Sequence, residues 1–76
     1  MNKGDRIIWD SHFGYDIGYY IGGGVMYNTH HIELMTGKYP GGELSVPLYE
    51  IHPYSDKLIT ELTKKYGYEK AFAKDF

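Results

Sequence analysis

Apolar and polar residues alternate along the first half of the chain, which is the pattern of β-strands with one covered face. A polar turn at residues 3–6 leads into a short β-branched and aromatic run at residues 7–10, which predicts a first strand. A second strand is expected at residues 15–21, where every second position is apolar: Tyr15, Ile17, Tyr19 and Ile21. Gly18 inside this strand predicts a bulge or a close approach of another backbone.

Three consecutive glycines, Gly22, Gly23 and Gly24, then interrupt the alternation. Because glycine adopts positive φ angles without strain, this segment is expected to form a tight reversal. Residues 25–36 would run back as a long third strand. Its apolar face changes sides partway, which predicts a bulge or bend near His30 and His31.

A turn-rich segment at residues 37–42 separates the third strand from a last strand expected at residues 43–52. Pro47 lies inside this run and marks a sheet edge or a bulge, because proline has no backbone N–H to donate. Residues 48–51 are expected to be its best paired part. Pro53 closes the strand.

A helix is predicted over residues 55–67. Ser55 is a good N-cap, Tyr54 and Ile59 have the spacing of a hydrophobic staple, and Gly67 ends the helix. One apolar stripe runs along it, formed by Leu58, Ile59, Leu62 and Tyr66.

These elements predict a mainly β (α+β) fold in a single domain, residues 1–76. Four or five short strands joined by hairpins, with a C-terminal helix covering an open face, most simply form a small, bent antiparallel barrel. A chain of this length buries only about 60% of its extended surface, so its stability margin is small. Association into a homodimer or higher assembly is therefore expected.

The composition limits the cellular location and the kinds of partner that are expected. The chain has no cysteine, which excludes disulfides and thiolate metal sites, and a reducing interior is expected. The start has no signal-peptide pattern and no run is long enough for a transmembrane helix, so a cytoplasmic location is predicted. Eight basic residues stand against ten acidic ones, which argues against broad attraction to a nucleic-acid backbone.

Tyrosine is the unusual component, with nine in 76 residues. Tyrosine offers a large ring with a polar end, which suits a binding face as well as a half-exposed core. The rings expected around the second and third strands are those of Tyr15, Tyr19, Tyr20, Tyr27 and Tyr39. About half of them would belong to the core. Tyr20 is the first choice for a contact, because it would face away from Ile17 and Ile21.

Other residues offer weaker binding chemistry. The amides of Gly22, Gly23 and Gly24 could contact an anion or a partner, although a plain hairpin tip is the favoured interpretation. Arg6, with Lys38 and Lys57, would supply phosphate contacts, which are too few for a long nucleic acid and adequate for a small nucleotide.

Catalysis, a metal and a cofactor are not expected. The four histidines match no ligand spacing, and neighbours such as His30 and His31 point to opposite faces of a strand. Ser11 beside His12, or Ser45 near His52, would be the only pairs for a nucleophile and its base, and neither forms a known motif.

Residues 3–9, Lys-Gly-Asp-Arg-Ile-Ile-Trp, with the glycine-containing strand at residues 15–22, resemble the first hairpin of SH3-like small barrels of the Tudor and KOW type. The resemblance implies binding of peptides, RNA or protein surfaces without catalysis. The aromatic cage of Tudor domains and the basic loops of KOW domains are not found here. Residues 54–70 resemble the endings of short phage and mobile-element proteins. This resemblance implies an accessory protein that blocks a host defence or enzyme, either by occupying its surface or by sequestering its nucleotide signal.

The function expected from the sequence is thus a non-enzymatic binding module that engages a protein partner through a tyrosine-rich barrel face, as a phage-type inhibitor of a host system does. The competing expectation is a nucleotide or single-stranded nucleic-acid binding protein that uses Tyr20, Tyr27 and the glycine turn.

Overall fold

The computed structural model describes residues 1–24, 26–37 and 40–67. It contains five strands, a short 3-10 helix and one α-helix, in the order β1 (Arg6–Asp10), β2 (Tyr15–Gly23), β3 (Thr29–Leu34), β4 (Glu43–Pro47), η1 (Leu48–Glu50), β5 (Ile51–Pro53) and α1 (Asp56–Tyr66). The strands form one open antiparallel sheet in the order β4-β3-β2-β1-β5. The predicted mainly β fold with one C-terminal helix is confirmed.

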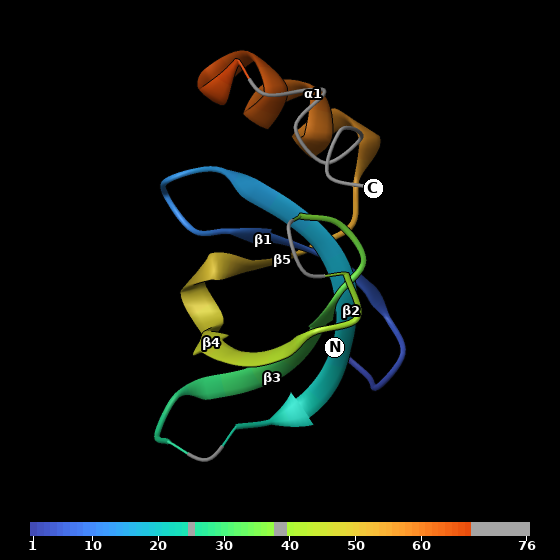
Figure 1. Ribbon diagram of the computed structural model, residues 1–76, viewed down its shortest axis with the longest axis vertical. Helices are drawn as coiled ribbons and strands as arrows, with labels where there is room; N and C mark the ends of the chain where they lie inside the picture. Colours follow the sequence, from blue (N-terminus) through green and yellow to red (C-terminus); the bar gives the residue numbers. More distant parts are fainter. Residues whose placement is uncertain (25, 38–39, 68–76) are drawn as a thin grey trace.

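The sheet is strongly bent, with β1 and β5 facing β3 and β4 across its concave side (Figure 1). Its two edge strands, β4 and β5, are separated along the chain by only the three residues of η1. A connection this short cannot cross the width of a flat five-stranded sheet, because neighbouring strands lie about 4.8 Å apart. The sheet must therefore curl until its edges approach one another.

Two features of β2 allow this curl. The pairing register with β3 shifts between Tyr20 and Gly22, so that Ile21 is an extra residue, and such a bulge bends and twists a strand. The predicted irregularity beside His30 and His31 is thus present, on the strand that faces them. Gly18 is a place of close approach, since a Cβ there would lie 2.3 Å from the carbonyl oxygen of Glu33.

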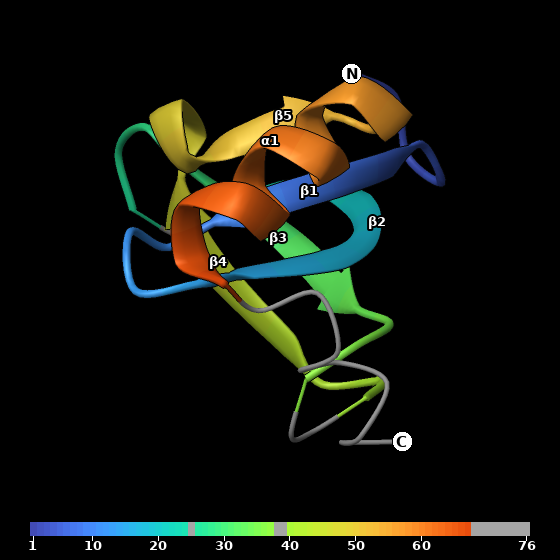
Figure 2. The same cartoon turned by 90° about the horizontal axis from the view of Figure 1, so that it is seen from above.

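Strand β1 is covered on both faces. Ile7 and Ile8 are consecutive and both fully buried. Ile7 points into the concave side, where the core consists of Ile7, Tyr20, Ile32, Val46 and Ile51. Ile8 points the other way, towards α1, which lies across the outer side of β1 and β2 (Figure 2). The helix thus forms a second core on the outer face of the sheet. It does not cover an open end of the curled sheet.

The helix has the ends that its sequence predicts. The Ser55 side chain accepts a hydrogen bond from the Leu58 N–H at 3.3 Å, and Gly67 ends the helix in a left-handed conformation with φ 60°. The predicted stripe of Leu58, Ile59, Leu62 and Tyr66 packs against Ile8 and Tyr15. Among the described residues, no helix is long and apolar enough to cross a membrane.

Two strand predictions are wrong in part. The third strand begins only at Thr29, because Gly24 and residues 26–28 belong to the reversal. The expected strand at residues 43–52 is divided after Pro47. Of residues 48–51, which were expected to be its best paired part, the first three form the 3-10 helix and only Ile51 belongs to a strand. Its two halves pair at opposite edges of the sheet, β4 with β3 and β5 with β1.

Substitution of two glycines of β2 tests the close approach at Gly18. Gly18→Ala places a methyl group against a backbone oxygen that cannot move without breaking the sheet, so we expect the free energy of unfolding to fall by about 2 kcal/mol or more. Gly23→Ala is the matched control, since a Cβ there meets nothing within 4 Å. Urea unfolding of the control should show unchanged or slightly raised stability, by about 0.5 kcal/mol. Equal losses in both variants would contradict the assigned packing.

Candidate binding groove

Exposed apolar side chains gather on the connections at one side of the sheet. The large hydrophobic residues that the described part of the chain exposes are Met1, Phe13, Met26, Tyr27, Leu48 and Tyr49. All except Met1 belong to three connections: residues 11–14, residues 24–28 and η1. Figure 1 shows these connections on the same side of the molecule, to the left. Apolar side chains concentrated in this way indicate an interaction site.

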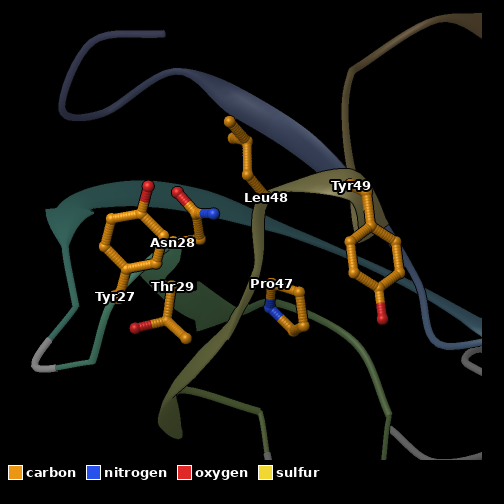
Figure 3. Close-up of a pocket in the computed structure, with 6 residues that line it drawn as sticks. All are labelled: Tyr27, Asn28, Thr29, Pro47, Leu48 and Tyr49. Carbon is orange, nitrogen blue, oxygen red and sulfur yellow. The ribbon is translucent and has the colours of Figure 1, made fainter.

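Between two of these connections lies a groove of about 510 Å³, lined by Tyr27, Asn28, Thr29, Pro47, Leu48 and Tyr49. The rings of Tyr27 and Tyr49 stand on either side of Pro47 (Figure 3). Tyr27 is 92% exposed and Tyr49 is 73% exposed, so most of the surface of each residue lies outside the core. The volume falls in the range of roughly 300–1,000 Å³ that holds small ligands or inserted side chains.

Hydrogen bonds fix η1 on both sides of the groove. The Leu48 N–H donates to the carbonyl oxygen of Asn28 at 3.2 Å, which joins η1 to the turn between β2 and β3. The Trp9 indole N–H donates to Glu50 Oε1 at 2.9 Å, which joins η1 to β1. The groove is therefore formed in the folded chain before any partner arrives.

The turn that carries Tyr27 is also well determined. Thr29 closes it twice, since its N–H and its hydroxyl both donate to the carbonyl oxygen of Met26, at 3.1 and 2.7 Å. Asn28 supplies the left-handed residue, with φ 61°, which asparagine tolerates better than most residues. Gly24 is required at the start of the turn, because a Cβ there would lie 2.5 Å from Thr29 Oγ1.

His12 extends the aromatic surface beyond Tyr49. Its ring stacks on that of Tyr49 with a centroid distance of 6.4 Å and an interplanar angle of 28°. The His12 backbone is left-handed, with φ 71°, and its N–H donates to Asp10 Oδ1 at 2.9 Å. Ser11 and Gly14 close the same loop through a backbone hydrogen bond of 3.0 Å.

Beneath this loop, Asp10 and Tyr66 share a short hydrogen bond in which the Tyr66 hydroxyl donates to Asp10 Oδ1 at 2.6 Å. Burial raises the pKa of the Asp10 carboxyl, but the hydrogen bonds from Tyr66 and the His12 amide and the charges of Lys65 and His12 outweigh it, so the pKa is lowered overall. Donation to Asp10, burial and the carboxylate charge raise the pKa of Tyr66 to about 12. The pair therefore remains a carboxylate and a neutral phenol at neutral pH.

Charge separates the groove from the basic part of the surface. None of the eight lysines and arginines of the chain lies in residues 11–14, 24–29 or 47–50. Arg6 lies at the opposite end of β1 from the loop at residues 11–14, with its guanidinium 4.9 Å from the ring centroid of Tyr54. The groove can bury an apolar or aromatic group and hydrogen-bond it through Asn28 and Thr29, but none of the described residues that line it offers a cation to a phosphate.

Of the tyrosines that were predicted as contacts and are described by the structure, only Tyr27 lies in the groove. Tyr15 is 1% exposed and packs under α1, and its hydroxyl hydrogen-bonds with Thr63 Oγ1 at 2.8 Å. Tyr20 is 9% exposed in the concave core, with its hydroxyl 2.6 Å from His30 Nδ1. The expectation that these two rings are exposed is wrong, because the curl and the helix cover both faces of β2. Tyr39, like Lys38, lies outside the described residues.

The glycine segment is not the hairpin tip. Gly22 and Gly23 belong to β2 and pair with His31 and His30, and none of the three glycines has a positive φ. The reversal follows them, with Asn28 in the left-handed conformation. An anion cradle formed by the three glycines at a loop tip is therefore wrong for this fold.

The serine and histidine residues pair differently from the two pairs considered in the sequence. The Ser11 hydroxyl donates to the carbonyl oxygen of Gly14. Ser45 lies 3.2 Å from His31 Nδ1, and His31 Nε2 lies 3.6 Å from Glu43. This group sits on a sheet face, with 58% of the Glu43 side chain exposed, so water screens its charges. No group of three or more potential metal ligands occurs among the described residues.

The sequence interpretation missed Leu48 and Tyr49, which are two of the six residues that line the groove. Both were assigned to a paired strand, where every second side chain would face the core. Pro47 was the available signal, because a proline inside a strand pattern marks a place where pairing ends. Phe13 and Met26 carried no signal beyond their position in loops.

The Asp10–Tyr66 pair predicts how stability depends on pH. A carboxyl whose folded pKa is lowered stabilises the fold above its unfolded pKa, about 3.9, and loses this contribution as pH falls through the folded value. Tyr66 contributes below pH 10 and loses its contribution as pH rises towards 12. Urea unfolding of Asp10→Asn should therefore show a smaller loss of stability below pH 4 than the wild type. Parallel acid curves would contradict the assignment.

No protein-family model matches the chain, and no curated protein or solved structure was found to be similar to it. The geometry and chemistry of the groove itself therefore carry the functional conclusion.

Proposed function

We propose that this chain is a non-enzymatic binding module that engages a protein partner through the groove between Tyr27 and Tyr49. One observation carries the proposal: the exposed apolar side chains of a very small fold are concentrated on three connections at one side of the sheet, and two of these connections line the groove. In a chain whose core has eight buried hydrophobic residues among those described, leaving five large apolar side chains exposed at one place sacrifices stability.

The energetics of the groove suit a protein interface. Tyrosine is enriched among the residues that dominate interface energies, and each ring can bury about 150–250 Å². The hydrogen bonds of Asn28, Thr29 and Trp9 hold the walls in place, so little ordering is needed when a partner binds.

The chemistry of the occupant follows from the lining. We expect an apolar side chain of the partner between the two rings and backbone polar groups against Asn28 and Thr29. The chain carries a net charge of −2, Glu50 lies beside Tyr49, and no lysine or arginine in the described part of the chain lines the groove. The best complement is a neutral or basic segment of the partner.

The curled sheet supports a further part of the proposal, that the fold is a small barrel of the SH3-like kind. Its edge strands are joined by three residues and its concave side is filled by one apolar core. That the partner is a host protein blocked by a phage-type inhibitor remains the expectation from the resemblance of residues 54–70.

The competing nucleotide hypothesis draws no support from the groove. A base can stack on an exposed tyrosine ring, but a nucleotide also needs positive charge for its phosphates. Arg6 lies over Tyr54 at the far end of β1, and Lys57 belongs to α1 on the outer side of the sheet. The protein partner is therefore the better proposal.

Serine variants of the two rings test the proposed function. Proteins that the immobilised chain recovers from a bacterial lysate are identified, purified and titrated calorimetrically against the wild type, Tyr27→Ser and Tyr49→Ser. Each variant should weaken the affinity about 30-fold, the loss of about 2 kcal/mol typical of a central interface tyrosine. The matched control is Tyr19→Ser, the same change on β2 outside the groove, which should leave the affinity unchanged.

Equal affinities in all four proteins would place the interface elsewhere and contradict the proposal. Sedimentation equilibrium tests the other possible occupant of the groove, a second copy of this chain. A wild-type dimer that Tyr49→Ser converts to a monomer would show that the groove holds a second copy of this chain instead of another protein.

A further inference from the structure

One buried carboxylate oxygen holds two distant parts of the molecule. Asp10, the last residue of β1, is 7% exposed. Its Oδ1 atom accepts the N–H of His12, at 2.9 Å, and the hydroxyl of Tyr66, at 2.6 Å. The first donor belongs to the loop at the groove, and the second is the last residue of α1.

The first of these bonds shapes the groove wall. His12 has a left-handed backbone, which residues other than glycine adopt only when their surroundings favour it. The bond from its N–H to Asp10 favours this turn. The same turn carries the His12 ring to its stacked position on Tyr49, 6.4 Å between centroids.

The second bond depends on how α1 ends. Gly67 closes the helix in a left-handed cap, and its N–H donates to the carbonyl oxygen of Thr63 at 2.7 Å. Tyr66 is thereby kept in the last helical turn, on the apolar stripe that faces Ile8 and Tyr15. From there its hydroxyl reaches across to the end of β1.

We propose that Asp10 is a positioning residue that couples the docking of α1 to the shape of the groove, through a continuous path of contacts from Tyr66 to Asp10 to His12 to Tyr49. The coupling belongs to the folded chain alone. Its consequence for binding rests on the proposed function.

Burial gives this coupling its strength. A carboxylate that loses the Tyr66 hydroxyl inside the fold is left poorly solvated, and that is costly unless water enters. Water can take the place of the lost hydroxyl at Oδ1 when the loop at residues 11–14 or the end of α1 moves away. Separation of the helix end therefore loosens the loop, and by linkage a partner that presses on His12 and Tyr49 strengthens the docking of α1.

Amide hydrogen exchange and proton NMR of the full chain test the coupling without any partner. In Tyr66→Phe, we expect the His12 amide to exchange about tenfold faster, the effect of losing a hydrogen bond to a charged group. The Tyr49 ring resonances should move towards random-coil positions as the stack with His12 is lost. Asp10→Asn, which keeps an acceptor oxygen, should be closer to the wild type than Asp10→Ala.

Thr63→Val is the matched control. It removes the hydrogen bond between Thr63 and Tyr15, one helical turn before Tyr66, and leaves the Asp10 oxygen untouched. Its His12 exchange rate and Tyr49 resonances should match those of the wild type. Urea unfolding of Thr63→Val and Tyr66→Phe establishes that the two variants are compared at equal global stability. Equal changes in both variants, or none in Tyr66→Phe, would overturn the proposal.

The affinity for the recovered partner separates the two proposals. If Tyr49→Ser leaves this affinity unchanged while Tyr66→Phe still frees His12, the coupling stands and the groove is not the interface. If Tyr49→Ser weakens binding and Tyr66→Phe changes neither His12 nor the affinity, the groove binds and the coupling is wrong.

Discussion

A three-residue connection between the two edges of the sheet constrains the rest of this fold. Because β4 and β5 lie at opposite ends of the strand order and only Leu48–Glu50 separates them, the sheet has to curl. Curling turns one face into a concave core around Ile7 and Ile32 and leaves the outer face of β1 and β2 for α1. The same connection then forms one wall of the groove. The fold and the candidate site therefore depend on a single short segment.

A chain of 76 residues has few apolar side chains to distribute, and this one divides them unevenly. Tyr15 and Tyr20 bury their rings in the two cores, where their hydroxyls form hydrogen bonds. Tyr27 and Tyr49 stay at the surface. Four hydrogen-bonded attachments hold the exposed rings in place, through Asn28, Thr29, Trp9 and Asp10. Such preorganisation reduces the entropy lost on binding, which is where a small module gains affinity.

Local signals made the helix predictable, since Ser55, Gly67 and the apolar stripe act within a few residues of one another. The close approach at Gly18 could also be predicted, because a glycine inside a strand often marks a bulge or a site where another backbone approaches closely. Tyr20 was misplaced because alternation assumes one covered face, and coverage of both faces is a property of the tertiary fold. Tyr49 was missed for a related reason: no sequence period shows that the chain changes sheet edges after Pro47. Tyr27 was expected in the third strand, but it lies in the turn before that strand and is 92% exposed.

Intermolecular nuclear Overhauser effects between the labelled chain and its recovered partner test the central claim most directly, since they report which side chains touch the partner. A partner held in the groove would give effects to the ring protons of Tyr27 and Tyr49 and to the Leu48 methyl groups, and none to Arg6 or Tyr19. Effects confined to Arg6, Tyr19 or the exposed side of α1, with the groove rings silent, would contradict the assignment of this surface as the binding site.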